Sequence, residues 1–532
     1  MNWADARPFR REVHFDTRVV RCYLDRPSSA DALLHEAVAT WPHAEALVDG
    51  ERRYRFDELN RTVENVAGNL STLGLAVGDR IALFLGNCAE FVITVLAAAR
   101  LGAVIVPIGA RLQRPEVAHI MADCGARVLV ADAALAQQIP DRAAMPDVRT
   151  VVAVDGEIEG AARYTDLTGP CAAPHVAVAE DAPYAILYTS GTTGTPKGAV
   201  LTNLGIVHAA MQFADCWNLQ PGERCILAVP ASHATGIGAV IATMMRVGGC
   251  IIVMRSFKAR DFLVLAERER LSYAAMAPTM YNLLLLDPAL RNFNLAAWRV
   301  GGYGAAPMPP ATIAALADAL PKLQLVNAYG ATETTAPPLL MPLGQTPNHP
   351  QSVGCAVPTA EVMLADDAGR EVAKGETGEI WMRGPTISPG YWRNAAANAD
   401  SFADGWWKSG DIGAFEEDGF LRVLDRKKDM IIRGGYKVFS AEVENVLTSH
   451  PEVVECAVVA RSDPVLGERV HAFVVARESG LAAQSLTEWC ASRLADYKQP
   501  ETFTIQIEPL PRNPTGKVLK QELRSGLALP LR

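Results

Sequence analysis

The chain has 532 residues, of which 49% are hydrophobic and 20% are charged, a balance typical of a soluble globular protein. This length exceeds what a single hydrophobic core normally organises, so we expect a large compound domain and at least one smaller one. The formal net charge of −9 disfavours nucleic acid as the main partner, and an anionic ligand must therefore be held by local donors.

Cysteine usage and hydropathy bear on the compartment. The ten cysteines are scattered without a C-x-x-C pair, which indicates neither a zinc site nor a disulfide framework and favours a reducing cytoplasm. Met1–Pro27 mixes Arg with Asp and Glu and has no apolar core, so it is not a signal peptide. Phe91–Ala110, the longest apolar tract, is interrupted by Arg100 and contains Gly102 and Pro107, which indicates a buried helix followed by a strand. We expect a cytoplasmic protein without a transmembrane segment.

The first part of the chain alternates helical and strand-like patterns. Predicted helices span 32–40, 56–73, 89–101 and 115–124, and predicted strands span 46–48, 81–85, 103–107 and 127–131. Ile81–Leu85 is a continuous apolar run, typical of a strand buried on both faces. This alternation predicts βαβ units, that is, a parallel sheet with helices on both sides.

Residues 133–180 are rich in Ala and Pro with weak periodicity, and they are interpreted as a connection. The alternation then resumes, with predicted helices at 203–215 and 260–269, predicted strands at 225–229, 250–254 and 273–277, and a buried segment at 236–247. The fold class is therefore α/β, with two doubly wound halves in the large domain.

The pattern of predicted elements changes in the last third of the chain. Short alternating strands punctuated by glycine occupy about 351–425 and predict a small β subdomain. The charged run Asp425–Asp429 separates it from a compact α+β tail. We expect an N-terminal domain at 1–425 and a C-terminal domain at 429–532.

The stretch Tyr188–Gly198 predicts a phosphate-binding loop. Its glycines let the backbone approach a ligand, its hydroxyls and turn amides can donate to phosphate oxygens, and Lys197 adds a positive charge. It is not a Walker loop, because Pro196 stands where that motif needs glycine and Gly198 stands where it needs Ser or Thr. Taken alone, such a cluster would more simply be a turn between two strands.

These eleven residues resemble YTSGTTGTPKG, the phosphate loop of the adenylate-forming superfamily, which includes acyl-CoA synthetases, firefly luciferase and the adenylation domains of peptide synthetases. Other segments resemble further motifs of that superfamily and follow in order: Asn327–Glu333, Trp406–Asp411, Asp425–Asp429, Gly434–Lys437 and Pro511–Lys517. The resemblance covers the chain from about residue 30 onward.

Two loops lie close to the expected acyl pocket. His233, in Pro230–Gly236, follows a predicted strand, and open α/β sheets bind ligands at the carboxyl ends of their strands. A single His is more often a core residue, but the resemblance implies that His233 lines the carboxylate pocket. Gly301–Pro307 is not a dinucleotide turn, because Pro307 replaces the last glycine of G-x-G-x-x-G. It resembles the segment between the acyl pocket and the adenine.

The resemblance implies roles in nucleotide binding. Tyr329 lies against the adenine, Thr332 bonds the α-phosphate region and Glu333 binds Mg²⁺, a cation that prefers carboxylate oxygens. Asp411 and Arg426 hold the ribose. The full nucleotide site implied comprises Thr189, Ser190, Gly191, Thr192, Thr193, Gly194, Lys197, Gly302, Ala305, Asn327, Ala328, Tyr329, Gly330, Thr332, Asp411, Arg426 and Lys517.

The remaining implied roles concern catalysis, acyl binding and the second substrate. The catalytic residues are Lys517, Thr189, Glu333 and His233, and Thr189 shares the metal with Glu333. The substrate pocket comprises His233, Ala234, Gly236, Gly238, Tyr303 and Gly304. The coenzyme A tunnel is bordered by Gly434, Gly435 and Tyr436, and Lys428 is the pivot of a hinge at 426–428 that makes the C-terminal domain mobile.

The implied activity is that of an ATP-dependent carboxylic acid–CoA ligase, with MgATP and coenzyme A as cosubstrates. A carboxylate attacks the α-phosphorus to give an acyl-adenylate and pyrophosphate, and after rotation of the small domain the CoA thiol displaces AMP. The small residues around His233 suggest a roomy pocket for an aromatic, cyclic or medium-to-long aliphatic acid.

Other functions remain open at this stage. An amino-acid adenylation domain is disfavoured, because Ala234 follows His233 where those relatives place an Asp, and because little chain follows Lys517. Loading of a separate carrier protein and luciferase-like oxygenation are alternatives that thiol dependence of AMP release would distinguish. A non-enzymatic scaffold is disfavoured by the intact motifs. The sequence leaves both a monomer and a homodimer open.

Overall fold

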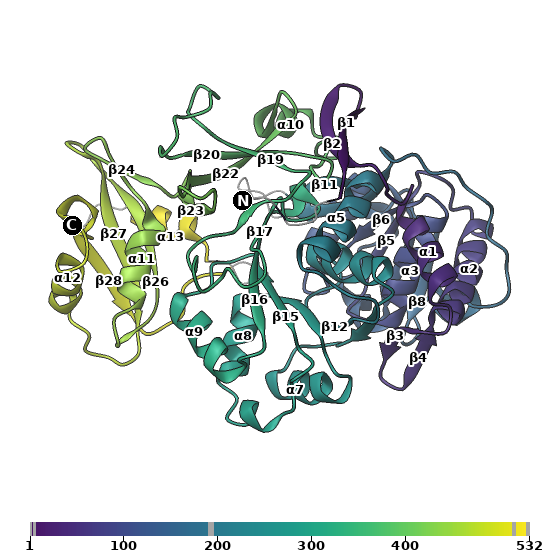
Figure 1. The fold of residues 1–532 in the computed structure, drawn as a ribbon. Helices are drawn as coiled ribbons and strands as arrows, with labels where there is room; N and C mark the ends of the chain where they lie inside the picture. The colour runs from purple at the N-terminus through teal and green to yellow at the C-terminus, as the bar shows by residue number, and fades with distance from the viewer. Residues whose placement is uncertain (1–2, 4–6, 190–195, 513–517, 528–532) are drawn as a thin grey trace. The chain divides into compact units, whose positions relative to one another are not determined.

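A computed structural model describes residues 3, 7–189, 196–512 and 518–527 (Figure 1). Its chain contacts divide it into two compact units. Unit 1 comprises Met1–Val362, Trp381–Lys408 and Asp418–Phe420, and unit 2 comprises Met363–Ile380, Ser409–Glu417 and Leu421–Arg532. The division runs through the predicted β subdomain, and the boundary expected at residue 425 stays a prediction.

The first sheet of unit 1 has seven strands in the order β11-β10-β6-β5-β7-β8-β9. Their bounds are β5 Arg80–Phe84, β6 Val104–Pro107, β7 Ala126–Asp132, β8 Thr150–Val154, β9 Ala162–Arg163, β10 Pro183–Thr189 and β11 Lys197–Thr202. All pairs are parallel except the hairpin of β10 and β11. Helix α3 (Ala89–Arg100) is buried along its whole length, as its apolar sequence predicts, and α4 (Arg114–Cys124) follows β6.

The second sheet of unit 1 has nine strands in the order β18-β17-β16-β15-β14-β12-β13-β3-β4. Their bounds are β3 Glu45–Asp49, β4 Arg52–Arg55, β12 Arg224–Leu227, β13 Cys250–Val253, β14 Tyr273–Met276, β15 Val300–Gly304, β16 Gln324–Tyr329, β17 Leu339–Leu340 and β18 Cys355–Ala356. The accompanying helices are α1 Ala30–Thr40, α2 Phe56–Thr72, α5 Asn203–Cys216, α6 Thr243–Arg246, α7 Ala259–Arg268, α8 Pro278–Leu285 and α9 Pro310–Ala319.

Several predictions about unit 1 are corrected by this topology. The strand predicted at 46–48 forms, but as β3 it pairs with β13 and belongs to the second sheet rather than the first. The segment 133–180 is not a plain connection, since β8 and β9 extend the first sheet. Both sheets also carry antiparallel strands at their edges. By contrast, the burial predicted for the segment 236–247 is confirmed, and the segment forms a π-helix over Thr235–Ala242 that continues into α6.

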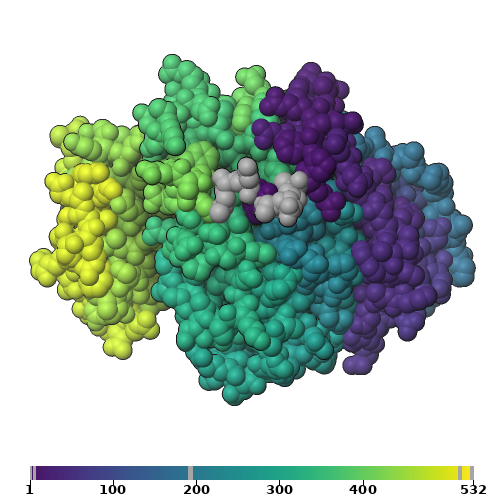
Figure 2. Space-filling model, viewed as in Figure 1, coloured from purple at the N-terminus to yellow at the C-terminus, as the bar shows by residue number. Residues whose placement is uncertain are grey.

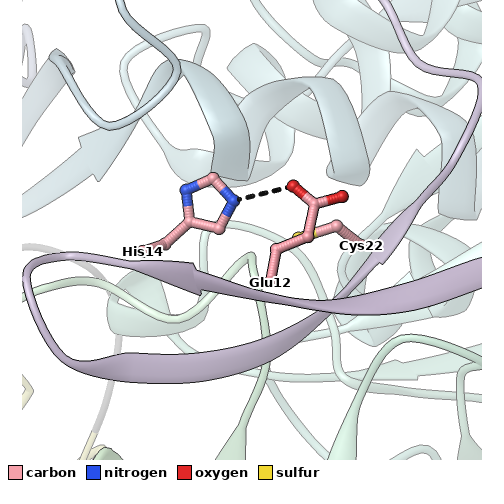
Figure 3. A group of neighbouring side chains, drawn as sticks. All are labelled: Glu12, His14 and Cys22. Carbon is pink, nitrogen blue, oxygen red and sulfur yellow. Dashed lines mark hydrogen bonds and ion pairs between the residues drawn. The ribbon is translucent and has the colours of Figure 1, made fainter.

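An N-terminal hairpin of β1 (Phe9–His14) and β2 (Arg18–Tyr23) was not anticipated from the sequence. In the space-filling view the hairpin, coloured dark purple, lies on the surface (Figure 2), and Val13 is 65% exposed. The inward face of the hairpin carries Glu12, His14 and Cys22 (Figure 3).

These three side chains have the residue types of a metal site, but Arg26 already supplies the positive charge there. Its Nη2 lies 2.8 Å from Oε2 of Glu12, and this contact lowers the pKa of Glu12 to about 2. The ring of His14 bridges Glu12, 3.3 Å from Nε2, and Asp181, 2.6 Å from Nδ1. The cluster therefore pins the hairpin to the rest of unit 1 by ion pairing.

A five-stranded sheet follows, with the order β19-β20-β22-β21 and β23 paired to β22. Its bounds are β19 Glu361–Ala365, β20 Gly378–Arg383, β21 Phe402–Ala403, β22 Trp406–Phe415 and β23 Leu421–Arg426, and α10 covers Ala395–Ser401. These strands confirm that this region is rich in β-structure, as predicted.

The C-terminal part of unit 2 is the predicted α+β fold. Its sheet has the order β25-β24-β27-β26, with β28 parallel to β27. The bounds are β24 Ile431–Arg433, β25 Tyr436–Val438, β26 Val453–Asp463, β27 Gly467–Ala476, β28 Thr502–Gln506, α11 Ser440–Thr448, α12 Ala483–Ala491 and α13 Lys520–Gly526. Helices α11 and α12 pack on β26 and β27 through a core that contains Val443, Val458 and Leu486. None of the helices in the described ranges has the length and hydrophobicity of a membrane span.

Candidate active site

The predicted phosphate loop connects two antiparallel strands. Thr189 ends β10 and pairs with Lys197, which begins β11, and the Thr189 hydroxyl donates to the Lys197 carbonyl oxygen over 3.4 Å. A Cβ at Gly198 would lie 2.6 Å from Ile186, so a side chain there would collide with the neighbouring strand. The hairpin therefore holds Thr189 and Lys197 side by side at the mouth of the loop. Ser190, Gly191, Thr192, Thr193 and Gly194 lie outside the described residues.

The second motif begins at the end of β16. Asn327, Ala328 and Tyr329 belong to this strand, and a one-turn helix, η6 (Thr332–Thr334), follows Gly330. A Cβ at Gly330 would lie 2.9 Å from the backbone of Pro337, which explains the glycine. Glu333 is 9% exposed, and its backbone oxygen accepts a 2.8 Å hydrogen bond from the amide of Ser388.

The backbone directly after Glu333 is strained. Thr335 has φ +56° and ψ −49°, a positive-φ conformation that β-branched residues rarely adopt. Such conformations persist where the surrounding structure enforces them, often at functional sites. An added Cβ at Gly238, in the π-helix, would lie 3.3 Å from the Thr335 carbonyl oxygen, and one at Gly205, in α5, would lie 3.2 Å from its hydroxyl. The Glu333 turn, the pocket helix and the helix after the phosphate hairpin therefore meet at Thr335.

Strand β15 carries the glycines expected to leave room for ligands. Here they also serve packing: a Cβ at Gly302 would lie 2.9 Å from the indole of Trp217, and one at Gly304 would lie 2.5 Å from the Ala328 carbonyl oxygen. Tyr303 is only 2% exposed and lies in the core, where burial raises its pKa to about 12 despite a hydrogen bond with Asn327. After the strand, Ala305 has φ +65°.

His233 and Ala234 precede the π-helix, and the amide of Ile237 donates to the carbonyl oxygen of His233 over 3.1 Å. The His233 side chain is exposed to solvent, yet desolvation by the surrounding protein lowers its pKa below the usual range. The lowered pKa favours the neutral imidazole. At Gly236 a Cβ would lie 2.7 Å from Ala231 Cα, so the tight turn itself requires glycine.

Unit 2 carries the residues predicted for ribose and coenzyme A. Asp411 and Arg426 face each other on β22 and β23, with 2.8 Å between Arg426 Nε and an Asp411 carboxylate oxygen. Gly434 and Gly435 have φ of +56° and +88° in the turn between β24 and β25, which explains both glycines. Tyr436 follows them and stacks on Tyr497, with ring centroids 4.8 Å apart.

For two lysines of unit 2 that were predicted to act in the site, the structure gives few contacts or none. Lys428 lies in the turn after β23, where its carbonyl oxygen accepts a 3.4 Å bond from Arg524. Lys517 lies outside the described residues.

Sequence analysis missed the segment Ser388–Trp392, which lies against both motifs of unit 1. The amide of Trp392 donates to Gly198 over 2.7 Å, and the hydroxyl of Tyr391 donates to Oε1 of Glu333 over 2.8 Å. The one signal in the sequence is a tyrosine–tryptophan pair directly after Pro389 and Gly390, a loop position where large aromatics need a reason.

The chemistry of Glu333 fits the predicted Mg²⁺. It offers a carboxylate, the hard ligand that this ion prefers, in a nearly buried position. The bond from Tyr391 engages one carboxylate oxygen, and the other can bind a cation. Thr189 could add a hydroxyl oxygen from the phosphate hairpin.

Together, the fold and the site define an adenylate-forming enzyme. The AMP-binding enzyme family matches residues 34–392, and the AMP-binding enzyme C-terminal domain matches residues 442–517. The chain belongs to this family.

Several similar proteins are CoA ligases by name. The chain is 34% identical to a feruloyl-CoA synthase of Amycolatopsis sp (91% of this chain, 96% of that one) and 34% identical to a long-chain-fatty-acid–CoA ligase of Mycobacterium tuberculosis (92% and 97%). The solved o-succinylbenzoate CoA synthetase of Bacillus subtilis, in complex with its acyl-adenylate intermediate, matches with a TM-score of 0.82 at 28% identity (92% and 97%). The protein is an AMP-forming acid–CoA ligase that uses ATP, Mg²⁺ and coenzyme A, which confirms the activity and cosubstrates predicted from the sequence.

Proposed function

We propose that this ligase activates a hydrophobic carboxylic acid with an uncharged tail, either aromatic, cyclic or medium-to-long aliphatic. Ala234 supports this, since a carboxylate at that place would be needed to pair a substrate ammonium, and an unpaired buried ammonium costs several kcal/mol. The nearby residues Gly236 and Gly238 add no charged side chain that could pair with such an ammonium. The feruloyl and long-chain-acyl substrates in the names of two relatives are of the same kind.

In the first half-reaction, an oxygen of the acid's carboxylate forms a bond to the α-phosphorus of ATP, and the bond to pyrophosphate breaks. We assign Thr189, Lys197 and the loop between them to hold the phosphates, and Lys517 to bridge the attacking carboxylate and the phosphorus as charge shifts. Glu333 holds Mg²⁺, which neutralises phosphate charge when bound. The convergence at Thr335 of the Glu333 turn, the π-helix after His233 and α5, the helix that follows the phosphate hairpin, is the observation that carries this assignment.

In the second half-reaction, the sulfur of coenzyme A attacks the acyl carbon, its proton leaves, and the bond to AMP breaks. Gly434, Gly435 and Tyr436 are assigned to the thiol arm, and Asp411 and Arg426 to the ribose. A pivot at Lys428, between domains at 1–425 and 429–532, would let one site serve both steps. The charged run around Lys428 and its resemblance to the family hinge support this proposal.

We also propose a reducing compartment, the cytoplasm, because all ten cysteines, each within the described ranges, are free. Either a monomer or a homodimer is compatible with this function, and light scattering of the purified protein decides between them.

The experiment that tests the proposed substrate class measures pyrophosphate release with acetate, butyrate, octanoate, benzoate, a phenylpropenoate and phenylalanine at fixed MgATP and CoA. Each buried CH₂ adds roughly 0.8 kcal/mol, so kcat/KM should rise along the aliphatic series until the chain meets the pocket floor. Preference for acetate or phenylalanine over every larger neutral-tailed acid contradicts the proposal. AMP release that does not depend on a free thiol would favour the carrier-loading or oxygenase alternatives.

A further inference from the structure

Tyr391 contacts two of the residues assigned to ATP. Its hydroxyl donates a 2.8 Å hydrogen bond to Oε1 of Glu333, and Nζ of Lys197 lies 5.5 Å from the centroid of its ring. An ammonium at this distance is attracted by the negative face of the ring. One side chain thus touches the predicted metal ligand at its polar end and the phosphate-loop lysine at its face.

The backbone around Tyr391 is fixed to both motifs. On one side, the amide of Val200 donates to Gly390 over 3.1 Å and Tyr391 forms an antiparallel bridge with Ala199, so the segment continues the edge of β11. On the other side, the amide of Ser388 donates to the backbone of Glu333. A side chain held at this many points can impose a geometry on its neighbours.

The tyrosine is also suited to remain a donor. A tyrosine hydroxyl ordinarily keeps its proton at neutral pH, so it can donate to the adjacent carboxylate. A neutral hydroxyl that donates to an ionised carboxylate makes a charge-assisted bond, which holds the carboxylate plane in one orientation. The free rotation of Glu333 about its last bond is thereby removed.

We propose that Tyr391 is a positioning residue for the metal-bound phosphates of ATP, fixing the carboxylate of Glu333 and the ammonium of Lys197 in one arrangement. The inference rests on the proposed role of Glu333 as the Mg²⁺ ligand. It predicts two separable contributions, one from the hydroxyl and one from the ring.

Three variants test it. Tyr391→Phe removes the hydroxyl and keeps the ring, Tyr391→Leu removes both, and Glu333→Gln removes the carboxylate. Tyr391→Phe removes a hydrogen bond to a charged group, so it should raise the Mg²⁺ concentration for half-maximal adenylation on the order of 10-fold or more. Tyr391→Leu should in addition raise the KM for ATP at saturating Mg²⁺, and the KM for CoA should stay unchanged in both.

A binding measurement accompanies the kinetics. Mn²⁺ bound together with α,β-methylene-ATP, counted by electron paramagnetic resonance, should show weaker ternary binding in Tyr391→Phe. Tyr164→Phe is the control, because its buried hydroxyl bonds Thr94 far along the chain from Glu333, and it should lose stability without a change in metal dependence.

The possible outcomes distinguish a failure of the proposed role of Glu333 from a failure of the proposed role of Tyr391. If Glu333→Gln leaves the Mg²⁺ dependence unchanged, the proposed role of Glu333 is wrong. If Glu333→Gln shifts it and Tyr391→Phe matches the wild type within twofold, Tyr391 is not a positioning residue. The double variant Tyr391→Phe/Glu333→Gln shows whether Tyr391 acts through Glu333. If its Mg²⁺ dependence shifts as much as that of Glu333→Gln alone, Tyr391 acts through Glu333. If the shifts of the two single variants add, Tyr391 does not act through Glu333.

Discussion

Arg18 donates a 2.8 Å hydrogen bond to the carbonyl oxygen of Ser388, from which it is separated by 370 residues in the chain. Its second nitrogen donates to Pro389 over 2.6 Å, and its guanidinium lies over the ring of Phe402. The N-terminal hairpin therefore braces the segment that carries Tyr391. Burial lowers the pKa of Arg18, because the charged guanidinium loses hydration where it contacts this segment.

Replacing Arg18 tests the brace. Arg18→Ala removes both bonds and leaves the carbonyl oxygen of the buried residue Ser388 without this donor, at a cost of about 1–3 kcal/mol for a buried unsatisfied group. We expect a lower unfolding midpoint and a several-fold higher KM for MgATP, with Arg18→Lys intermediate, because one ammonium cannot reproduce the fork of donors. Arg11→Ala is the control, because this 65% exposed side chain lies on the face of β1 opposite Glu12 and His14. An unchanged KM in Arg18→Ala would show that the hairpin does not influence the site.

The two half-reactions should respond oppositely to two variants. Lys517→Ala should reduce adenylation on the order of 10²-fold or more and leave thioester formation from supplied acyl-AMP largely intact, since its charge serves the first transition state. Lys428→Pro should impair thioester formation more, because proline fixes φ and restricts the preceding residue. Each variant is the control for the other. Equal losses in both half-reactions of Lys428→Pro would place the pivot elsewhere.

Ala234 should govern the preference for an uncharged tail. Ala234→Asp would place a carboxylate beside His233, where an apolar substrate cannot compensate its desolvation. We expect kcat/KM for octanoate or a phenylpropenoate to fall at least about tenfold, and the ratio of phenylalanine to these acids to rise. Ala314→Asp, on the exposed face of α9, adds the same charge outside the pocket and should change neither value. No change in that ratio for Ala234→Asp would place the substrate tail away from this residue.

Acid should destabilise unit 1 through His208. This ring is fully buried, its Nε2 accepts from the amide of Tyr23, and burial lowers its pKa to about 3. Because the unfolded ring has a pKa near 6.5, the unfolded state binds more protons between these values. The stabilisation is complete above about pH 6.5 and is lost as the pH falls toward 3, at up to about 1.4 kcal/mol per pH unit.

The measurement is the urea midpoint at pH 7 and pH 5. His208→Gln should be less stable than the wild type at pH 7 but should lose less on acidification, whereas exposed His43→Gln should follow the wild type. A wild-type loss equal to that of His208→Gln would show that His208 does not carry the acid response.

The candidate site could be proposed from the sequence because the motifs that define it are local along the chain. The phosphate loop, the turn with Glu333 and the turn with Gly434 each fall within one short stretch, and their glycines and hydroxyls have the residue types that the chemistry requires. Likewise, helix α3 and strand β5 formed where hydrophobic periodicity placed them.

Only the tertiary structure shows which strands pair and which side chains far apart in the sequence contact one another. Strand β3 has the same apolar run as any strand buried on both faces, so its sequence could not reveal that it joins β13 in the second sheet. Tyr391 and Arg18 lie in stretches without a motif, and their roles arise from contacts with Glu333 and Ser388 that lie 58 and 370 residues away. Local patterns specify elements and ligand-binding loops, whereas the side chains that hold those loops in place are chosen by long-range packing, which leaves no periodic trace in the sequence.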